Sequence, residues 1–382
     1  MTQNATPGDG EKKGARPSPA VAAPNSGELV RTEVPRAYGS AGESAWHLSR
    51  RAWGLVARRV RHELFMNAMM DRAATLTFFT VLTALPMVLG VYSIATLVLA
   101  RNEEQVQKLT ADFIGTYLPP EWENAAQRVV DAVVGSTQQS TLMLVLSVVL
   151  ALFSSSAYVR AFARSANAMY GRVEGRGLVR TWTVMWLLTI AVVLGLVVIF
   201  VALMLQRDIV VGLLRPFGGV PGVSSVRSFL VDSFLPVWQW LRWPVVAVMS
   251  VTLLALLYRF APNVRTQKFQ WLTVGSTIAL LGAVVAWGLV RVYFTVVGAR
   301  SAYGALGTVI IALFALWIMN TLFILGVKID AEITRAIELE RGLESERVIQ
   351  APPRATDSAV AQSAAVRELE GLGKEIRGQA RS

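Results

Sequence analysis

Residues 181–206 read TWTVMWLLTIAVVLGLVVIFVALMLQ and contain no Asp, Glu, Lys or Arg. An α-helix rises about 1.5 Å per residue, so about 20 apolar residues cross the roughly 30 Å hydrocarbon core of a bilayer. This stretch, the most uniformly apolar in the chain, is therefore long enough to cross a membrane as one helix.

Charged residues make up only 16% of the 382 residues, against about 25% in an average soluble domain, and they crowd between long uncharged runs. These runs predict an all-α membrane protein with six transmembrane helices. The predicted spans are residues 73–100, 139–159, 181–206, 233–258, 269–290 and 301–327. Because Pro236, Arg242 and Pro244 interrupt the fourth span, we expect that helix to be broken.

Lys and Arg in the connections predict the orientation. The N-terminal flank 50–72 and the connections 160–180 and 259–268 are denser in these residues than the alternate connections 101–138 and 207–232. Cytoplasmic segments carry this excess, so both termini are predicted to be cytoplasmic, and an even number of spans agrees. The predicted location is the inner membrane of a bacterial cell, with the chain as a multi-pass protein.

Three regions follow from this pattern. Residues 1–43, rich in Pro, Gly, Ala and Ser, are predicted to be a disordered N-terminal tail. Residues 44–335 form the six-helix membrane domain, and residues 336–382 form a cytoplasmic C-terminal tail. We expect a charged helix to run into that tail as far as about Val348.

Residues 44–72 predict an N-terminal amphipathic helix, because Trp53, Val56, Val60 and Leu64 recur at three- and four-residue intervals among arginines. Two interpretations are open. In the first, the helix is interfacial, with its arginines on anionic lipid in the cytoplasmic head-group region. In the second, it packs on the inner ends of the spans.

The composition excludes several classes of site. The chain has no cysteine and two histidines, His47 and His62, both ahead of the first span, so disulfides, thiolate metal sites and a ligand cluster for a metal-dependent hydrolase are not expected. Gly-rich phosphate-binding and dinucleotide-binding motifs are also missing. We therefore expect no enzyme activity, no cofactor and no metal. The net charge of +11 is attributed to topology and lipid head groups, so nucleic acid is not an expected partner.

Three segments carry a family resemblance in combination. They are Leu152-Phe-Ser154-Ser155-Ser156-Ala-Tyr158 with Ala166-Asn167 after span two, Leu257-Tyr258-Arg259-Phe-Ala-Pro262-Asn263 after span four, and Tyr303-Gly304-Ala-Leu-Gly307 with Leu325-Gly326-Val-Lys328 in span six. In order and spacing, over about residues 60–335, the chain resembles the YihY/virulence factor BrkB family of bacterial inner-membrane proteins. The residues that match its motifs are Ser155, Tyr158, Asn167, Tyr258, Pro262, Asn263, Tyr303, Gly304 and Gly326.

The resemblance implies six helices with cytoplasmic termini. It also implies a link to serum resistance and to lipid or lipopolysaccharide-precursor handling in the envelope. The family once carried the label ribonuclease BN, which is generally regarded as mistaken. One departure concerns the exit of span six, which usually reads Gly-Ala-Glu before an Asn. This chain has Gly326-Val327-Lys328 there, so either Asp330 or Glu332 supplies any role of that acid, or the role is absent.

Arg242 is the one strong charge placed within a predicted span. In one interpretation it lies in a broken helix that lines a polar cavity and meets an anionic group such as a lipid phosphate. In the other, the span starts near Trp243, and Arg242 belongs to an interfacial belt of tryptophans.

A possible polar pathway is formed by Thr77, Thr80 and Thr83 in span one and Asn320 in span six. The alternative is that the threonines bond to carbonyls of their own helix and that Asn320 makes a helix–helix bond.

Together these features predict a transporter or flippase that moves a lipidic or amphipathic anion in envelope biogenesis. The alternative is a non-catalytic scaffold or interaction protein of the cell envelope. Membrane lipids are the expected partners, a homo-oligomer is left open, and partner proteins are not identified by these residues.

Overall fold

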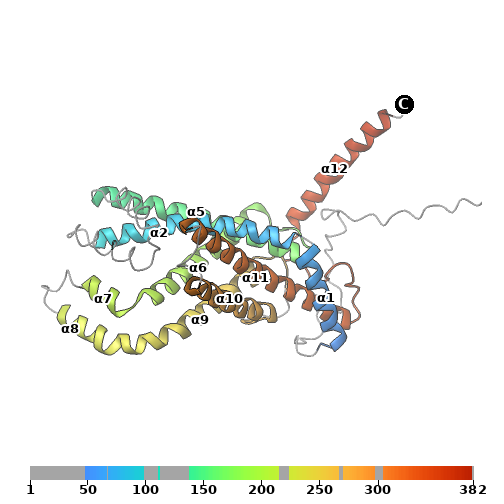
Figure 1. Cartoon of the computed structure of the whole chain (residues 1–382). Coiled ribbons are helices and arrows are strands. Elements are labelled where there is room, and N and C mark those ends of the chain that lie inside the picture. Colours follow the sequence, from blue (N-terminus) through green and yellow to red (C-terminus); the bar gives the residue numbers. More distant parts are fainter. Residues whose placement is uncertain are drawn as a thin grey trace, which may run out of the picture.

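The computed structural model describes residues 48–66, 68–98, 111, 137–214, 223–265, 270–296 and 304–380, and these residues form an all-helical bundle (Figure 1). The helices are α1 (Arg50–Met66), α2 (Met69–Val98), α5 (Thr137–Met169), α6 (Leu178–Met204), α7 (Arg207–Leu214), α8 (Val223–Ser228), the π-helix η5 (Phe229–Phe234), α9 (Leu235–Phe260), α10 (Val274–Val296), α11 (Gly304–Glu340) and α12 (Asp357–Gln379). Predictions for the N-terminal tail 1–43, His47 and Tyr303 concern residues outside this set.

Five of the described helices are long and apolar enough to cross a membrane: Val145–Met169, Leu178–Met204, Val223–Phe260, Val274–Tyr293 and Val309–Glu340. They correspond to predicted spans two to six. The first predicted span corresponds to α2, whose 30 residues give it sufficient length, but its side chains from Met87 onward lie outside the described residues. An all-α membrane architecture is therefore confirmed, while the count of six spans and the side of the termini stay predictions.

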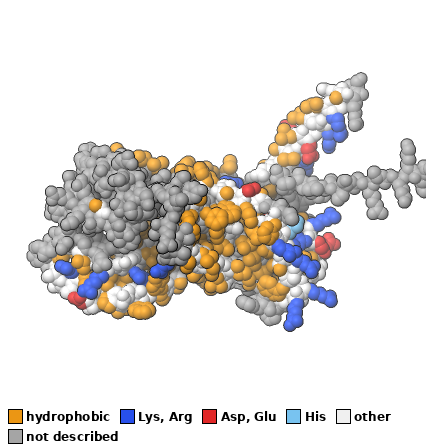
Figure 2. Space-filling view, in the orientation of Figure 1, with side chains coloured by type: hydrophobic (Ala, Val, Ile, Leu, Met, Phe, Trp, Pro, Cys, Tyr) orange, Lys and Arg blue, Asp and Glu red, His pale blue; other side chains and the backbone are white. Residues whose placement is uncertain are grey.

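The core lies in one half of the bundle. Buried residues such as Leu76, Phe162, Met185, Leu257 and Ile324 form one cluster, with many alanines and serines around them. Small residues let membrane helices approach closely. Further along the same helices, apolar side chains are exposed, and Figure 2 shows them as an orange band with charged side chains beyond it at the right-hand end. That band is the surface expected to face lipid, and we call the charged end, which carries α1 and the start of α12, the inner end.

The fourth span is not broken, contrary to the sequence prediction. Pro236 lies in the first turn of α9, where a helix needs no backbone N–H, and Pro244 lies inside a helix that continues on both sides. The strain appears as curvature and as the six-residue π-helical turn η5 just before α9. Figure 1 shows α8, η5 and α9 as one curved rod.

The apolar stripe of α1 packs against α11. Ala52 and Val56 are buried, with Trp53 and Val60 beside them, against Ile329 and its neighbours on α11. This is the second of the two arrangements that the sequence left open, with α1 across the inner end of the spans (Figure 1). Whether its arginines also touch head groups stays a prediction.

The helix of the last span ends at Glu340. The sequence had predicted that it would continue to about Val348. Gly342 has φ +77°, and the backbone N–H of Leu343 donates to the Glu338 carbonyl at 3.0 Å, which is a Schellman ending. Residues 341–356, which we call the C-terminal strap, then return across the inner ends of the helices. The strap is fixed by the Glu338 carboxylate, which accepts from the Ser345 hydroxyl at 2.6 Å and the Gln350 backbone at 2.7 Å.

We predict that Gly275→Ala destabilises the protein by about 1–3 kcal/mol, the range typical of overpacking. A Cβ at Gly275 would stand 2.0 Å from the backbone oxygen of Gly326, which cannot move without shifting α11. Thermal unfolding of the purified protein in detergent measures the effect. Gly288→Ala is the matched control on the same helix, because its Cβ would meet nothing within 4 Å. Equal melting temperatures for the two variants would contradict the close α10–α11 contact.

We also predict that tags fused to either end of the chain stay unreachable from outside intact cells, because the excess of Lys and Arg in alternate connections predicts that both ends are cytoplasmic. Protease or membrane-impermeant label applied to whole cells and to lysed cells makes the measurement. A tag modified in intact cells would overturn the orientation.

Candidate functional site

Three of the predicted pathway residues, Thr77, Thr80 and Asn320, meet in a polar cluster between three spans. The Asn320 amide nitrogen donates to the hydroxyls of Thr77 at 3.2 Å and Thr80 at 3.4 Å, and its oxygen accepts from the Tyr158 hydroxyl at 3.0 Å. We call Thr77, Thr80, Tyr158 and Asn320 the Asn320 cluster. It joins α2, α5 and α11 in the buried part of the bundle.

The cluster is closed on itself. Thr77, Thr80 and Thr83 each donate to the carbonyl four residues earlier, at 2.8–2.9 Å. Asn320 also donates to the Leu316 carbonyl at 3.0 Å, so its two amide hydrogens are shared among three acceptors. Each of these polar groups therefore has a partner within the protein, which matches the structural alternative that the sequence left open. The bonds of Asn320 with Thr77, Thr80 and Tyr158 run between helices, and bonds of this kind help to hold membrane helices together.

Arg242 lies elsewhere, near the opposite end of α9. It is 18 residues before Phe260, or about 27 Å along the helix. Its guanidinium lies 5.3 Å from the ring centre of Trp243, and its Nε is buried without a hydrogen-bond acceptor among the described residues. Trp240 and Trp243 are exposed beside it. Arg242 therefore has an aromatic neighbour but an unsatisfied donor.

Two family-motif asparagines join the loops at the inner end. The Asn167 side-chain oxygen accepts from the Asn263 backbone at 2.6 Å. The Asn263 side chain donates to the Ala355 carbonyl at 2.9 Å and accepts from the Ala355 backbone at 3.1 Å. The α5–α6 connection, the turn after α9 and the C-terminal strap are thus tied together. Gly175 fits here because a Cβ would stand 1.9 Å from the Ala355 oxygen.

Arginines cap the C-terminal end of α9. Arg176 donates to the carbonyls of Phe260 and Ala261, and Arg354 donates to the carbonyl of Arg259 at 2.6 Å. These carbonyls have no partner within their own helix, and the helix dipole makes that end negative. Burial, together with neighbouring arginines, lowers the pKa of Arg354 to about 10. The group therefore keeps its charge at neutral pH.

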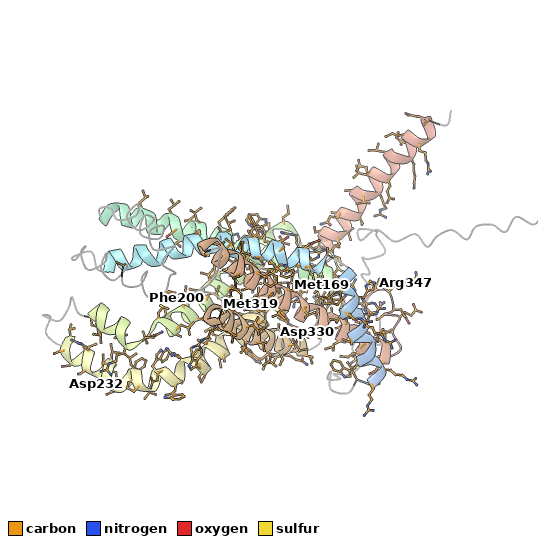
Figure 3. The ribbon with its side chains drawn as sticks, viewed as in Figure 1. Met169, Phe200, Asp232, Met319, Asp330 and Arg347 are labelled. Carbon is orange, nitrogen blue, oxygen red and sulfur yellow. The ribbon has the colours of Figure 1, made fainter. Side chains whose placement is uncertain are left out.

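The acids after span six have structural partners. The Asp330 carboxylate accepts from the Gly275 backbone at 2.8 Å and the Thr273 hydroxyl at 2.5 Å, so it caps the start of α10. Nearby, the Tyr258 hydroxyl donates to the Phe323 carbonyl at 2.5 Å. Gly326 admits that tyrosine, because a Cβ there would stand 2.2 Å from its oxygen. Asp330 lies toward the inner end in Figure 3, far from the labelled Asp232 at the other end.

The remaining motif residues have simpler places. Ser155 and Pro262 are buried, and Gly304 begins α11.

A cavity of about 540 Å³ opens at the inner end between α1 and α11, and the sequence analysis missed it. Charged side chains line it: Arg58, Arg59, His62, Glu63, Lys328, Glu332 and Arg335. We call it the inner cleft. Glu332, almost fully buried, accepts from Lys328 at 2.9 Å and Arg335 at 3.0 Å. Lys328 also pairs with Glu63 at 3.1 Å.

Sequence reasoning had one signal for this cleft. Lys328, Glu332 and Arg335 are spaced four and three residues apart, so they share one face of a helix. The cleft residues on α1 could not be placed opposite that face from the sequence, because their position depends on how α1 packs on α11.

A family model described as virulence factor BrkB matches residues 61–349, most of the chain. The chain belongs to the virulence factor BrkB family. One curated relative, "Putative ribonuclease-like protein YfkH" of Bacillus subtilis, is 27% identical over 192 residues, which is 50% of this chain and 65% of that protein. The match thus covers just under two thirds of the relative's length. No solved structure matches the chain significantly.

The ribonuclease-like name belongs to the relative. In the part of this BrkB-family chain that the structure describes, no three His, Cys, Asp or Glu side chains come together as a group that could hold a metal ion. The chain departs from the expected BrkB motif at Lys328, which stands where an acid was expected. In the structure Lys328 pairs with Glu332 in the inner cleft.

We predict that Asn320→Leu lowers the stability of this BrkB-family protein by about 1–2 kcal/mol, since interhelical hydrogen bonds in membranes contribute about 0.6–1.7 kcal/mol each. The variant removes the bonds to Thr77 and Thr80 and leaves the Tyr158 hydroxyl without its acceptor. Thermal unfolding in detergent measures it. Thr321→Val is the control, because the Thr321 hydroxyl donates to the Trp317 carbonyl of its own helix. An Asn320→Leu protein as stable as this control would mean that the cluster does not tie the helices.

Proposed function

We propose that the chain is a bacterial inner-membrane transporter or flippase that moves a lipidic or amphipathic anion, and that it is not an enzyme. The observation that carries the proposal is the buried Nε of Arg242, which has no acceptor among the described residues. A buried donor without a partner costs about 1–3 kcal/mol. A phosphate or carboxylate oxygen of a passing lipid would supply the missing acceptor and the opposite charge.

The position of Arg242 suits such a role. It lies about 27 Å from the inner end of α9 by the helical rise, so it would meet a head group near the outer face. Exposed Trp240 and Trp243 flank it, and indole rings favour the membrane–water boundary. Membership of the BrkB family agrees with a membrane function.

A second candidate is a membrane scaffold, and the Asn320 cluster favours it. Its polar groups are satisfied by one another rather than directed into a cavity. A bundle that only holds partners needs no internal pathway, and a possible homo-oligomer would fit this function as well.

Translocation in liposomes tests the proposal. The purified chain is reconstituted with phosphatidylglycerol labelled on its head group, and the accessible fraction is followed with a membrane-impermeant quencher. We predict that the wild-type chain speeds translocation over protein-free liposomes. Arg242→Ala should slow it at least about tenfold, which corresponds to loss of one charge-assisted hydrogen bond of about 1.5–3 kcal/mol. Arg242→Lys should keep part of the rate.

Arg227→Ala is the matched control, because Arg227 is an exposed arginine on the preceding helix α8. A wild-type rate equal to that of protein-free liposomes would favour the scaffold. Full translocation by Arg242→Ala would remove Arg242 from the mechanism.

A further inference from the structure

The inner cleft has a layered charge arrangement. At its floor, Lys328 and Arg335 are buried, and they are paired with Glu332 and Glu63. Two cations and two carboxylates leave the floor formally neutral. Buried charges are stable only when they are paired in this way. The floor therefore holds its own shape without a ligand.

The rim has a surplus of positive charge. Arg58 is exposed and has no hydrogen bond or ion pair to any residue that the structure describes. His62 lies one turn further on the same face of α1 and is exposed as well. Arg59 is half-buried, donates to the Glu346 carbonyl of the strap at 2.7 Å and pairs with Glu332 at 3.9 Å. The cleft as a whole thus carries a formal charge of +2, with its unused donors on α1.

We propose that the inner cleft binds the phosphate of an anionic lipid head group from the inner leaflet. A phosphate carries one or two negative charges and several acceptor oxygens, which arginine side chains bind well. The cavity of about 540 Å³ lies within the roughly 300–1,000 Å³ of small-ligand sites. Basic pockets at the cytoplasmic ends of membrane helices suit such head groups.

A membrane lipid fits the cleft better than a soluble phosphate because of its surroundings. Lys328 directly follows Val327, the last residue of the predicted sixth span, so it lies at the depth expected of head groups. Phe65, one turn beyond His62 on α1, exposes 67% of its surface and offers an apolar contact for an acyl chain. The apolar band of Figure 2 runs up to this charged end. The proposal holds whether or not the chain moves lipid.

Lipid retention by the full chain tests the proposal. The purified protein is placed in nanodiscs of phosphatidylcholine with cardiolipin as a minor component, and the bound cardiolipin is counted by native mass spectrometry. Arg58→Gln should weaken retention at least about tenfold, the effect of losing one charge-assisted hydrogen bond of about 1.5–3 kcal/mol to the phosphate. Arg61→Gln is the matched control, because Arg61 is an exposed arginine of α1 outside the cleft.

Three outcomes would overturn the proposal. Equal losses in the two variants would mean diffuse attraction to the whole of α1. Equal retention by Arg58→Gln and the wild-type chain would exclude the cleft as the site. Inorganic phosphate that binds without lipid, and loses affinity in Arg58→Gln while cardiolipin retention does not, would assign the cleft to a soluble anion. Because retention is measured at equilibrium, a failure of translocation leaves its result unchanged.

Discussion

Every backbone N–H and C=O group inside a bilayer must find its partner within the protein, because hydrocarbon offers none. Helices satisfy this requirement along their length but leave open groups at both ends. At the inner end of this bundle, side chains from other elements fill those positions. Arg176 and Arg354 donate hydrogen bonds to the last carbonyls of α9, and the Asp330 carboxylate caps the start of α10. The packing of the loops follows from where these helices end.

The same constraint explains why the family-motif residues described are not among those that line the inner cleft. Asn263 bonds with both the Asn167 side chain and the strap. Gly326 makes room for Tyr258. These residues join helix ends and loops, and their spacing in the sequence reflects the spacing of those ends. A motif that identifies the family can therefore describe its framework, while a binding site lies on a surface that the framework supports. In this chain the inner cleft is such a surface.

Hydropathy was sufficient to predict the second to sixth spans, since length and lack of charge are local properties. It failed where an outcome depends on contacts between distant segments. Pro244 stays inside α9 because the rod bends around it, which a single-residue rule does not foresee. The end of α11 was signalled by Gly342, but the charged residues after it suggested a longer helix. A helix–helix bond of Asn320 was one of the two interpretations that the sequence allowed. The inner cleft could not be predicted, because it forms only where α1 packs on α11.

The energy of the Asn320 cluster bears on how a transporter could use this bundle. Three interhelical bonds at an average of about 0.6 kcal/mol total about 2 kcal/mol, so these bonds alone would hold an open state to a few per cent of the population. A ligand shifts that equilibrium only by its preference for the open state. One charge-assisted hydrogen bond formed only in the open state contributes about 1.5–3 kcal/mol, which is enough to make the two states comparable. A closed cluster and an anion transporter are therefore energetically compatible, provided that the anion gains such a bond on opening. Arg242, with its unsatisfied Nε, is a residue that could make it.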